Sequence, residues 1–215
     1  MAFESKCVYC YQLGTGNCYK VGHTKNDPEE RKRGFASGSP VKATHYRSIQ
    51  TEYPSDLEKY IHQLLDERRA ENGEIFNVTA QELDDAVDRA LAFVEKFQPL
   101  RREAEKLRRN PPSNTMVESS SEMFEIYRKI RSLKREEYLI GQEIDFLESK
   151  IQIAIGDNCG MRGVASWKWA DNWRMDIERF KKEQSELYER YIHNSGSRRF
   201  LLERVDLSRI ISLSA

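Results

Sequence analysis

The sequence lacks any run of about 18 consecutive apolar residues, which a membrane-spanning helix needs. Its first residues, MAFESKCVYC, lack the basic and then apolar pattern of a secretion signal. These two absences predict a protein that stays inside the cell and makes no membrane contact. Its four cysteines are then expected to be reduced thiols, because disulfides are rare in the cytosol.

The sequence also lacks net charge, because 35 basic residues are balanced by 35 acidic ones. A strongly basic nucleic-acid-binding domain is therefore excluded, and any such site must be local. The charge is unevenly spread: residues 1–100 have a net charge of −3, residues 101–120 of +2 and the remainder of +1. This distribution predicts that the first half binds DNA weakly by itself and that the second half recruits the first half to its target.

The beginning of the chain reads as a hairpin followed by a helix and a third strand. Residues 5–12 and 18–24 are rich in aromatic and β-branched residues and flank the turn LGTGN. Asp27 and Pro28, followed by two glutamates, predict an N-cap and the first helical turn. Residues 41–50 have the composition of another strand.

Two capping boxes predict two further helices. Ser55 pairs with Glu58 in the first, and Thr79 pairs with Glu82 in the second. Pro99 is expected to interrupt or kink the second of these helices. A short strand, EIFNVT, is predicted between them, so the first half is expected to be an α+β domain with a small mixed sheet flanked by helices.

The second half is predicted to be mainly helical and separate from the first. A basic stretch, 101–109, leads into a polar, proline- and serine-bearing segment, 110–121, that is typical of a linker. We therefore expect domains at 1–109 and 122–215. A long amphipathic helix is predicted by apolar residues that recur at spacings of three, four or seven: Met123, Ile126, Ile130, Leu133, Ile140, Ile144, Leu147 and Ile151. Its heptad pattern is imperfect, so a coiled-coil homodimer stays an open alternative. A second helix is expected from about residue 171 to residue 193.

Side chains suited to phosphodiester cleavage occur in the first half. Such a reaction needs a carboxylate for a divalent metal, a cation to stabilise the phosphorane, and a phenol or imidazole to move the proton. Tyr9, Arg31, Glu58 and His62 offer these groups on three predicted elements. Each also has an ordinary interpretation: hairpin packing for the tyrosine, a solvated arginine, a capping glutamate and a histidine bonded to a neighbour.

The order of these residues resembles the GIY-YIG nuclease superfamily. Cys7-Val8-Tyr9, Lys20-Val21-Gly22, Arg31 and Glu58 stand in the order of its motifs. The resemblance is closest to a phage-associated branch whose second motif reads K-[IV]-G, and it covers roughly residues 5 to 80. That branch also shows a glutamate followed by histidine, as in Glu58 and His62, and a G-E-x-F motif, as in Gly73-Glu74-Ile75-Phe76.

The resemblance implies a DNA endonuclease that hydrolyses one strand at a time with a single Mg²⁺, or Mn²⁺. Glu58 would be the metal ligand, and Arg31 would stabilise the transferred phosphate. Tyr9 would position or deprotonate the attacking water. Lys20 and Arg33 are expected to contact nucleic acid.

Departures from the family pattern leave fewer side chains that could transfer a proton. The glycine of the first motif is Cys7, and the tyrosine of the second motif is Lys20. Tyr19 is adjacent but is expected on the opposite strand face. Phe35 stands one turn after Arg31, where a proton-carrying residue is common. Tyr9 is therefore expected to be the base, with His23 as the second choice.

Residues 122–205 resemble the C-terminal tail of YqaJ-type phage recombination exonucleases, without their nuclease core. The matching residues are Trp167-Lys168, Asp176, Phe180, Leu187-Tyr188, Tyr191 and Arg198-Arg199-Phe200. Lys168, Arg198 and Arg199 would bind nucleic acid if the tryptophans stack on bases. The alternatives are tryptophans that fill a helical hairpin with paired arginines, and a docking or self-association surface on the long helix.

Together these features predict a metal-dependent DNA endonuclease of phage or prophage type in the cytoplasm of a bacterial host. Its partners would be DNA and a replication or recombination protein that binds residues 122–215. The alternative is a catalytically weak or inactive member of the fold that acts as an adaptor or inhibitor of a nucleic-acid-processing factor. A nuclease directed at RNA is a further alternative.

Overall fold

The computed structural model describes residues 6–36, 41–70, 73–111, 113, 115–193 and 196–202, with the backbone alone for residues 34–36. The chain divides into two compact units, residues 1–109 and residues 110–215. The first unit is α+β and the second is mainly helical, which confirms the predicted fold class.

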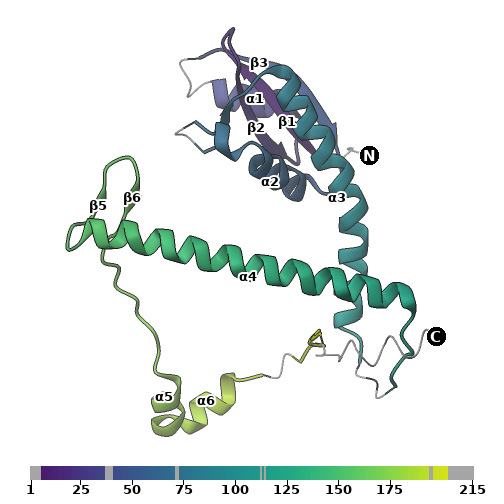
Figure 1. The fold of residues 1–215 in the computed structure, drawn as a ribbon, viewed down its shortest axis with the longest axis vertical. Helices are drawn as coiled ribbons and strands as arrows, with labels where there is room; N and C mark the ends of the chain where they lie inside the picture. Colours follow the sequence, from purple (N-terminus) through teal and green to yellow (C-terminus); the bar gives the residue numbers. More distant parts are fainter. Residues whose placement is uncertain are drawn as a thin grey trace. The chain divides into compact units, whose positions relative to one another are not determined.

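A four-stranded sheet forms the centre of the first unit (Figure 1). Its strands, in the spatial order β3-β1-β2-β4, are β3 Ala43–Gln50, β1 Cys7–Leu13, β2 Cys18–Thr24 and β4 Ile75–Asn77. The predicted hairpin of β1 and β2 is confirmed. Every pair of neighbouring strands in this sheet is antiparallel, whereas a mixed sheet was expected.

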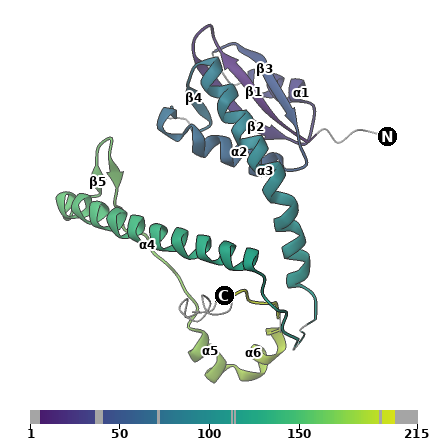
Figure 2. The same cartoon turned by 45° about the vertical axis from the view of Figure 1, so that its right-hand side comes forward.

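Three α-helices flank the sheet: α1 Pro28–Ala36, α2 Pro54–Leu64 and α3 Ala80–Arg108. A short 3₁₀ helix, Asp66–Arg68, follows α2. Figure 2 shows α2 and α3 beside the sheet from a second direction. The predicted capping box of Thr79 and Glu82 opens α3, with both reciprocal hydrogen bonds present.

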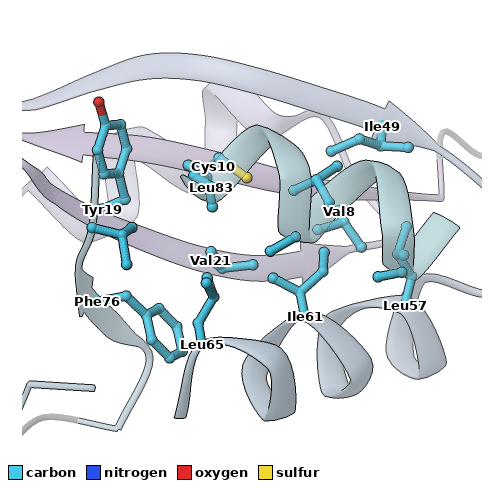
Figure 3. Close-up of a cluster of buried hydrophobic side chains, with 14 of the residues drawn as sticks. Val8, Cys10, Tyr19, Val21, Ile49, Leu57, Ile61, Leu65, Phe76 and Leu83 are labelled. Atoms are coloured by element: carbon cyan, nitrogen blue, oxygen red, sulfur yellow. The ribbon is translucent and has the colours of Figure 1, made fainter. Parts of the chain in front are cut away.

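The main core lies between the sheet and the pair α2 and α3. Because side chains alternate along a strand, Val8, Cys10, Tyr19 and Val21 share one face of the hairpin. Figure 3 shows them against Leu57 and Ile61 of α2, Leu65 just after that helix, and Leu83 of α3. A smaller cluster of Tyr9, Tyr11, Leu13 and Ala43 occupies the other face. Tyr19 and Tyr9 therefore face opposite ways, as predicted.

Two expectations about the helices of the first unit are wrong. Ser55 does not cap α2: its N-cap is Tyr53, without a side-chain hydrogen bond, because Pro54 already starts the helix. The expected interruption at Pro99 is also wrong, because α3 continues through the basic stretch to Arg108; the alternative of a kink at Pro99 stays a prediction. The hydrogen bond that Pro99 cannot make would go to the carbonyl of Glu95, which is exposed and can bind water instead.

The second unit begins with α4, Ser121–Ile155, a single helix of 35 residues (Figure 1). A two-stranded hairpin, β5 Gly160–Met161 and β6 Ala165–Ser166, follows it. The expected helix at 171–193 is wrong: two short helices form instead, α5 Ile177–Glu183 and α6 Ser185–Tyr191. Asp176 caps α5 by accepting the Arg179 N–H at 2.9 Å, which starts the helix later than predicted. Among the described residues of this unit, only Ile155 is buried.

The helices that the structure describes include none that could cross a membrane. The longest, α3 and α4, carry charged residues along their whole lengths.

Candidate active site

Tyr9 of β1 lies across the neighbouring strand at Gly22. The two residues are partners in the antiparallel register, and the Tyr9 side chain is 2% exposed. A Cβ atom built on Gly22 would lie 2.5 Å from Tyr9 Oη and 2.6 Å from Tyr9 Cζ, closer than real Cβ atoms come. The tyrosine ring therefore covers the Gly22 backbone, and only glycine allows this approach. The glycine of the K-V-G motif thus sets the path of Tyr9 across β2.

Tyr11 supports Tyr9 from the same face of β1. The two rings stack with centroids 4.4 Å apart and an interplanar angle of 19°. Tyr11 Oη donates a hydrogen bond of 2.5 Å to the carbonyl oxygen of Pro28, the first residue of α1. Burial raises the pKa of the Tyr11 phenol far above its ordinary value, so the phenol keeps its proton. Tyr11 therefore ties the start of α1 to the sheet.

Arg31 extends from α1 to the Tyr9 phenol. A hydrogen bond between the two side chains raises the pKa of Arg31, so the guanidinium stays charged. The predicted cap of α1 is confirmed: Asp27 Oδ1 accepts the Glu29 N–H at 2.9 Å, and the Asp27 carbonyl accepts the Arg31 N–H at 3.2 Å. Two residues predicted for the site, Tyr9 and Arg31, thus form one hydrogen-bonded pair.

Glu58 and His23 form a second pair. Glu58 Oε2, from α2, lies 2.6 Å from Nδ1 of His23 on β2. The Glu58 side chain is 12% exposed and the His23 side chain 37%. Because a carboxylate only accepts hydrogen bonds, His23 Nδ1 carries the proton and Nε2 is the nitrogen left for other partners. Glu58 is therefore occupied by a site contact and has no capping role.

A hollow of about 270 Å³ joins the two pairs. It is lined by His23, Thr24, Asn26, Glu30 and Arg31. His23 is held by Glu58, and Arg31 holds Tyr9, so all four predicted catalytic residues border or support this hollow. Asn26 and Glu30 were not predicted, and only their position around the cap of α1 could have indicated them.

Lys20, Glu74 and His62 form a polar group near the other end of β2. Lys20 Nζ forms an ion pair with a Glu74 carboxylate oxygen. The hydrogen bond from Lys20 lowers the pKa of Glu74, and the positive charges of Lys20 and Arg31 add to this effect. His62 Nε2 lies 3.1 Å from the Val21 carbonyl oxygen, so it donates to the β2 backbone. Glu74 thus has cationic neighbours that link this group to Arg31.

The other residues predicted to bind nucleic acid are exposed and scattered. Arg33 is exposed on α1, and the Phe35 side chain lies outside the described residues. Lys168 is exposed in the segment between β6 and α5. Arg198 donates a hydrogen bond of 2.8 Å to the Pro111 carbonyl oxygen, and Arg199 is exposed beside it. No contact of the described residues joins Lys168 to the two arginines.

The carboxylate of Glu58, which contacts His23 at the edge of the hollow, is a candidate ligand for a metal that is held partly by substrate. The described residues contain no group of three or more His, Cys, Asp or Glu side chains able to hold a metal. Mg²⁺ is commonly bound by one or two carboxylates, with water and substrate phosphates completing its shell. Glu58 supplies one carboxylate, and His23 engages only its Oε2. The residues present therefore fit one such ion.

Comparisons with known proteins give one family match, and it lies in the first unit. No curated protein and no solved structure matches the chain. The family match ends within α3, before the second unit begins, and it includes Tyr9, Arg31 and Glu58. Residues 6–91 match the T5orf172 domain, which is associated with phage nuclease-type proteins of the GIY-YIG and HNH kinds, and this indicates a nuclease-like or DNA-binding domain of phage type.

Proposed function

We propose that the first unit is a DNA endonuclease that hydrolyses phosphodiester bonds with one Mg²⁺ or Mn²⁺ ion. The hollow lined by His23 and Arg31 carries this proposal. An imidazole and a guanidinium line the hollow, and each contacts a second candidate outside the lining: Glu58 bonds His23, and Tyr9 bonds Arg31. That is the set of groups that phosphodiester hydrolysis requires.

Arg31 would bind the scissile phosphate and stabilise the charge that develops on it. Its guanidinium stays charged and presents several donors in a fixed plane, which matches phosphate oxygens. The Tyr9 phenol fixes the position of Arg31 before substrate binds. Such preorganisation is the main source of electrostatic catalysis, because no side chain has to reorient during the reaction.

We assign proton acceptance to His23 instead of Tyr9. Tyr9 is 2% exposed and is engaged with Arg31, whereas the His23 side chain is 37% exposed and lines the hollow. Glu58 holds His23 Nδ1–H, so Nε2 can accept the proton of an attacking water. Glu58 Oε1 would hold the metal, which when bound polarises a phosphoryl oxygen and offsets its charge.

The decisive test is nicking of supercoiled plasmid with and without Mg²⁺, by the parent and by Glu58→Ala. We expect a loss of at least about 100-fold in the variant, because both the metal and the His23 orientation depend on Glu58. The matched control is Glu95→Ala, an exposed glutamate on α3. Nicking by Glu58→Ala at the parental rate would refute the proposal.

The base is identified by comparing His23→Ala with Tyr9→Phe in the same assay. His23→Ala should lower the rate by about 100-fold or more, as expected for loss of a general base. Tyr9→Phe keeps the stacked ring and should reduce the rate less. A larger loss of rate in Tyr9→Phe than in His23→Ala would identify Tyr9 as the base.

A binding protein without catalysis is the second candidate. It is favoured by the burial of Tyr9 and by Lys20, which replaces the second tyrosine of the motif and is paired with Glu74. It predicts metal-independent binding of DNA or of a protein, with no nicking in Mg²⁺ or Mn²⁺. Matched DNA and RNA substrates would separate a DNA nuclease from an RNA nuclease.

The second unit is proposed to recruit the first to DNA or to a replication or recombination protein. Lys168 stands between Trp167 and Trp169, which are 47% and 91% exposed, so a basic side chain is flanked by rings available for stacking. Replacing Lys168, Arg198 and Arg199 together by alanine should weaken DNA binding and flatten its dependence on salt. Unchanged affinity at all salt concentrations would leave a protein as the proposed target.

A further inference from the structure

Helix α4 carries an apolar seam that is mostly exposed, with Ile130 and Ile151 half-buried. Its seam positions alternate at spacings of three and four, with first-position (a) residues Met123, Ile130, Glu137, Ile144 and Ile151, and fourth-position (d) residues Ile126, Leu133, Ile140, Leu147 and Ala154. Glu137 interrupts the apolar pattern, and the other nine positions are apolar. Leu133, Ile140 and Ile144 are 49%, 57% and 49% exposed. A seam of this period is what a coiled coil buries.

We propose that α4 pairs with α4 of a second copy of this chain, as an antiparallel coiled coil centred near residue 142. The pairing covers residues 130–154 of each helix, which is about 37 Å at 1.5 Å per residue. This length contains more than three heptads of the seam. It goes beyond the nuclease proposal and does not depend on it.

The charges that flank the seam argue against a parallel pair. The residues before each first position (g) are Glu122, Lys129, Glu136, Glu143 and Lys150, and those after each fourth position (e) are Tyr127, Lys134, Gly141, Glu148 and Ile155. In a parallel pair each g residue faces the following e residue of the partner. Lys129 would then face Lys134 and Glu143 would face Glu148, and each like-charge contact would occur twice.

An antiparallel pair brings opposite charges together. In the register centred near residue 142, e faces e and g faces g. Lys134 then meets Glu148, and Glu136 meets Lys150, each twice because of the two-fold symmetry. One like-charge contact remains, between Glu143 and its copy. All five residues are exposed on α4, and two of them make contacts that stay within the helix: Glu136 accepts a hydrogen bond from Ser132, and Lys150 lies over the Phe146 ring.

Gly141 supports this register independently. Glycine in the middle of a helix is unfavourable relative to alanine, and within the chain a Cβ atom at Gly141 would meet nothing within 4 Å. The packing of the chain itself therefore gives no reason for the glycine. In the proposed pair Gly141 lies next to the two-fold axis and faces its own copy, where a missing side chain lets the helices approach closely.

Sedimentation of the full chain at increasing concentration tests the pairing. We expect a monomer–dimer equilibrium, which Ile144→Lys shifts to the monomer by at least about 100-fold in Kd, because two lysines would enter the seam. The control is Leu139→Lys, which is equally exposed on α4 but outside the seam. Circular dichroism of both variants checks that α4 stays helical. Equal effects of the two variants would overturn the proposal. A parent chain that stays monomeric would also overturn it, and this is the result expected if a different protein covers the seam.

Charge reversal tests the orientation. In the antiparallel pair, Lys134→Glu and Glu148→Lys should each weaken dimerisation by about tenfold, and the double variant should restore it. In a parallel pair each single reversal would create an attractive contact with Lys129 or Glu143 and would strengthen the dimer. Strengthening by the single variants, or no rescue by the double variant, would overturn the antiparallel assignment.

Discussion

The two units of this protein use their apolar residues in different ways. In the first unit, strands and helices bury two apolar clusters, and residues such as Val8, Ile61 and Leu83 have no exposed surface. In the second unit, Ile155 is the only buried residue among those described, although α4 has the more regular apolar pattern. Periodicity therefore defines a face that can be buried, whereas burial requires a second surface of matching shape.

The largest expected effect is a difference in the stability lost on mutation between the core of the first unit and α4. Leu83→Ala removes a fully buried side chain and should cost about 2–5 kcal/mol of the free energy of unfolding. Leu139→Ala, at a position 56% exposed on α4, should cost less than about 0.5 kcal/mol. Urea unfolding followed by circular dichroism measures both. Similar losses would mean that α4 is buried as deeply as the sheet's core.

Alanine substitutions at two glycines of the first unit, Gly22 and Gly16, test how closely its side chains pack. Gly22→Ala would place a Cβ atom against the Tyr9 ring, so we expect a loss of about 1–3 kcal/mol in stability and a clear loss of plasmid nicking. Gly16→Ala is the matched control, because a Cβ atom there would meet nothing within 4 Å. If both variants nick DNA and unfold like the parent, Tyr9 does not lie over Gly22.

The smallest effect concerns the exposed ion pair of Lys20 and Glu74. Because its partners lower the pKa of Glu74 below the ordinary value of 4.5, the pair stabilises the fold above that pH. The contribution is lost as the pH falls through the lowered pKa. Glu74→Gln should cost less than about 1 kcal/mol at neutral pH, since the carboxylate is 52% exposed and screened by water.

The pH dependence is the check on that last prediction. The difference in unfolding free energy between the parent and Glu74→Gln should shrink as the pH is lowered below 4.5. Glu95→Gln, an exposed glutamate on α3, serves as the control and should change little at any pH. A Glu74→Gln difference that stays constant from acid to neutral pH would rule out the ion pair as its source.

Local sequence signals predicted the elements that depend on neighbours in the chain. The hairpin of β1 and β2, the Asp27 cap and the Thr79 capping box all involve residues within a few positions of one another. The same signals failed at Ser55, where Pro54 started the helix first, and at residues 171–193. In both places two local preferences competed, and the sequence does not rank them.

The candidate site shows the same limit. Tyr9, Arg31, Glu58 and His23 were predicted as separate residues, and the test of their roles is still to come. Their pairing was not predictable, because Glu58 and His23 are 35 positions apart and meet only when α2 packs on the sheet. We propose His23 instead of Tyr9 as the base because Tyr9 is buried and His23 is not. The burial of a residue in the folded chain cannot be read from the residues next to it in the sequence.

The sequence by itself determined the α+β composition of the first unit, the order of its motifs and the seam of α4, because these follow from residue type and spacing along one element. Tertiary structure decided that Glu58 holds His23, that Gly22 lies beneath Tyr9 and that Glu74 pairs with Lys20. Such contacts join elements far apart in the chain, and their geometry depends on how those elements pack. The seam of α4 follows from spacing along one helix, whereas the partner that we propose to cover it would be decided by assembly.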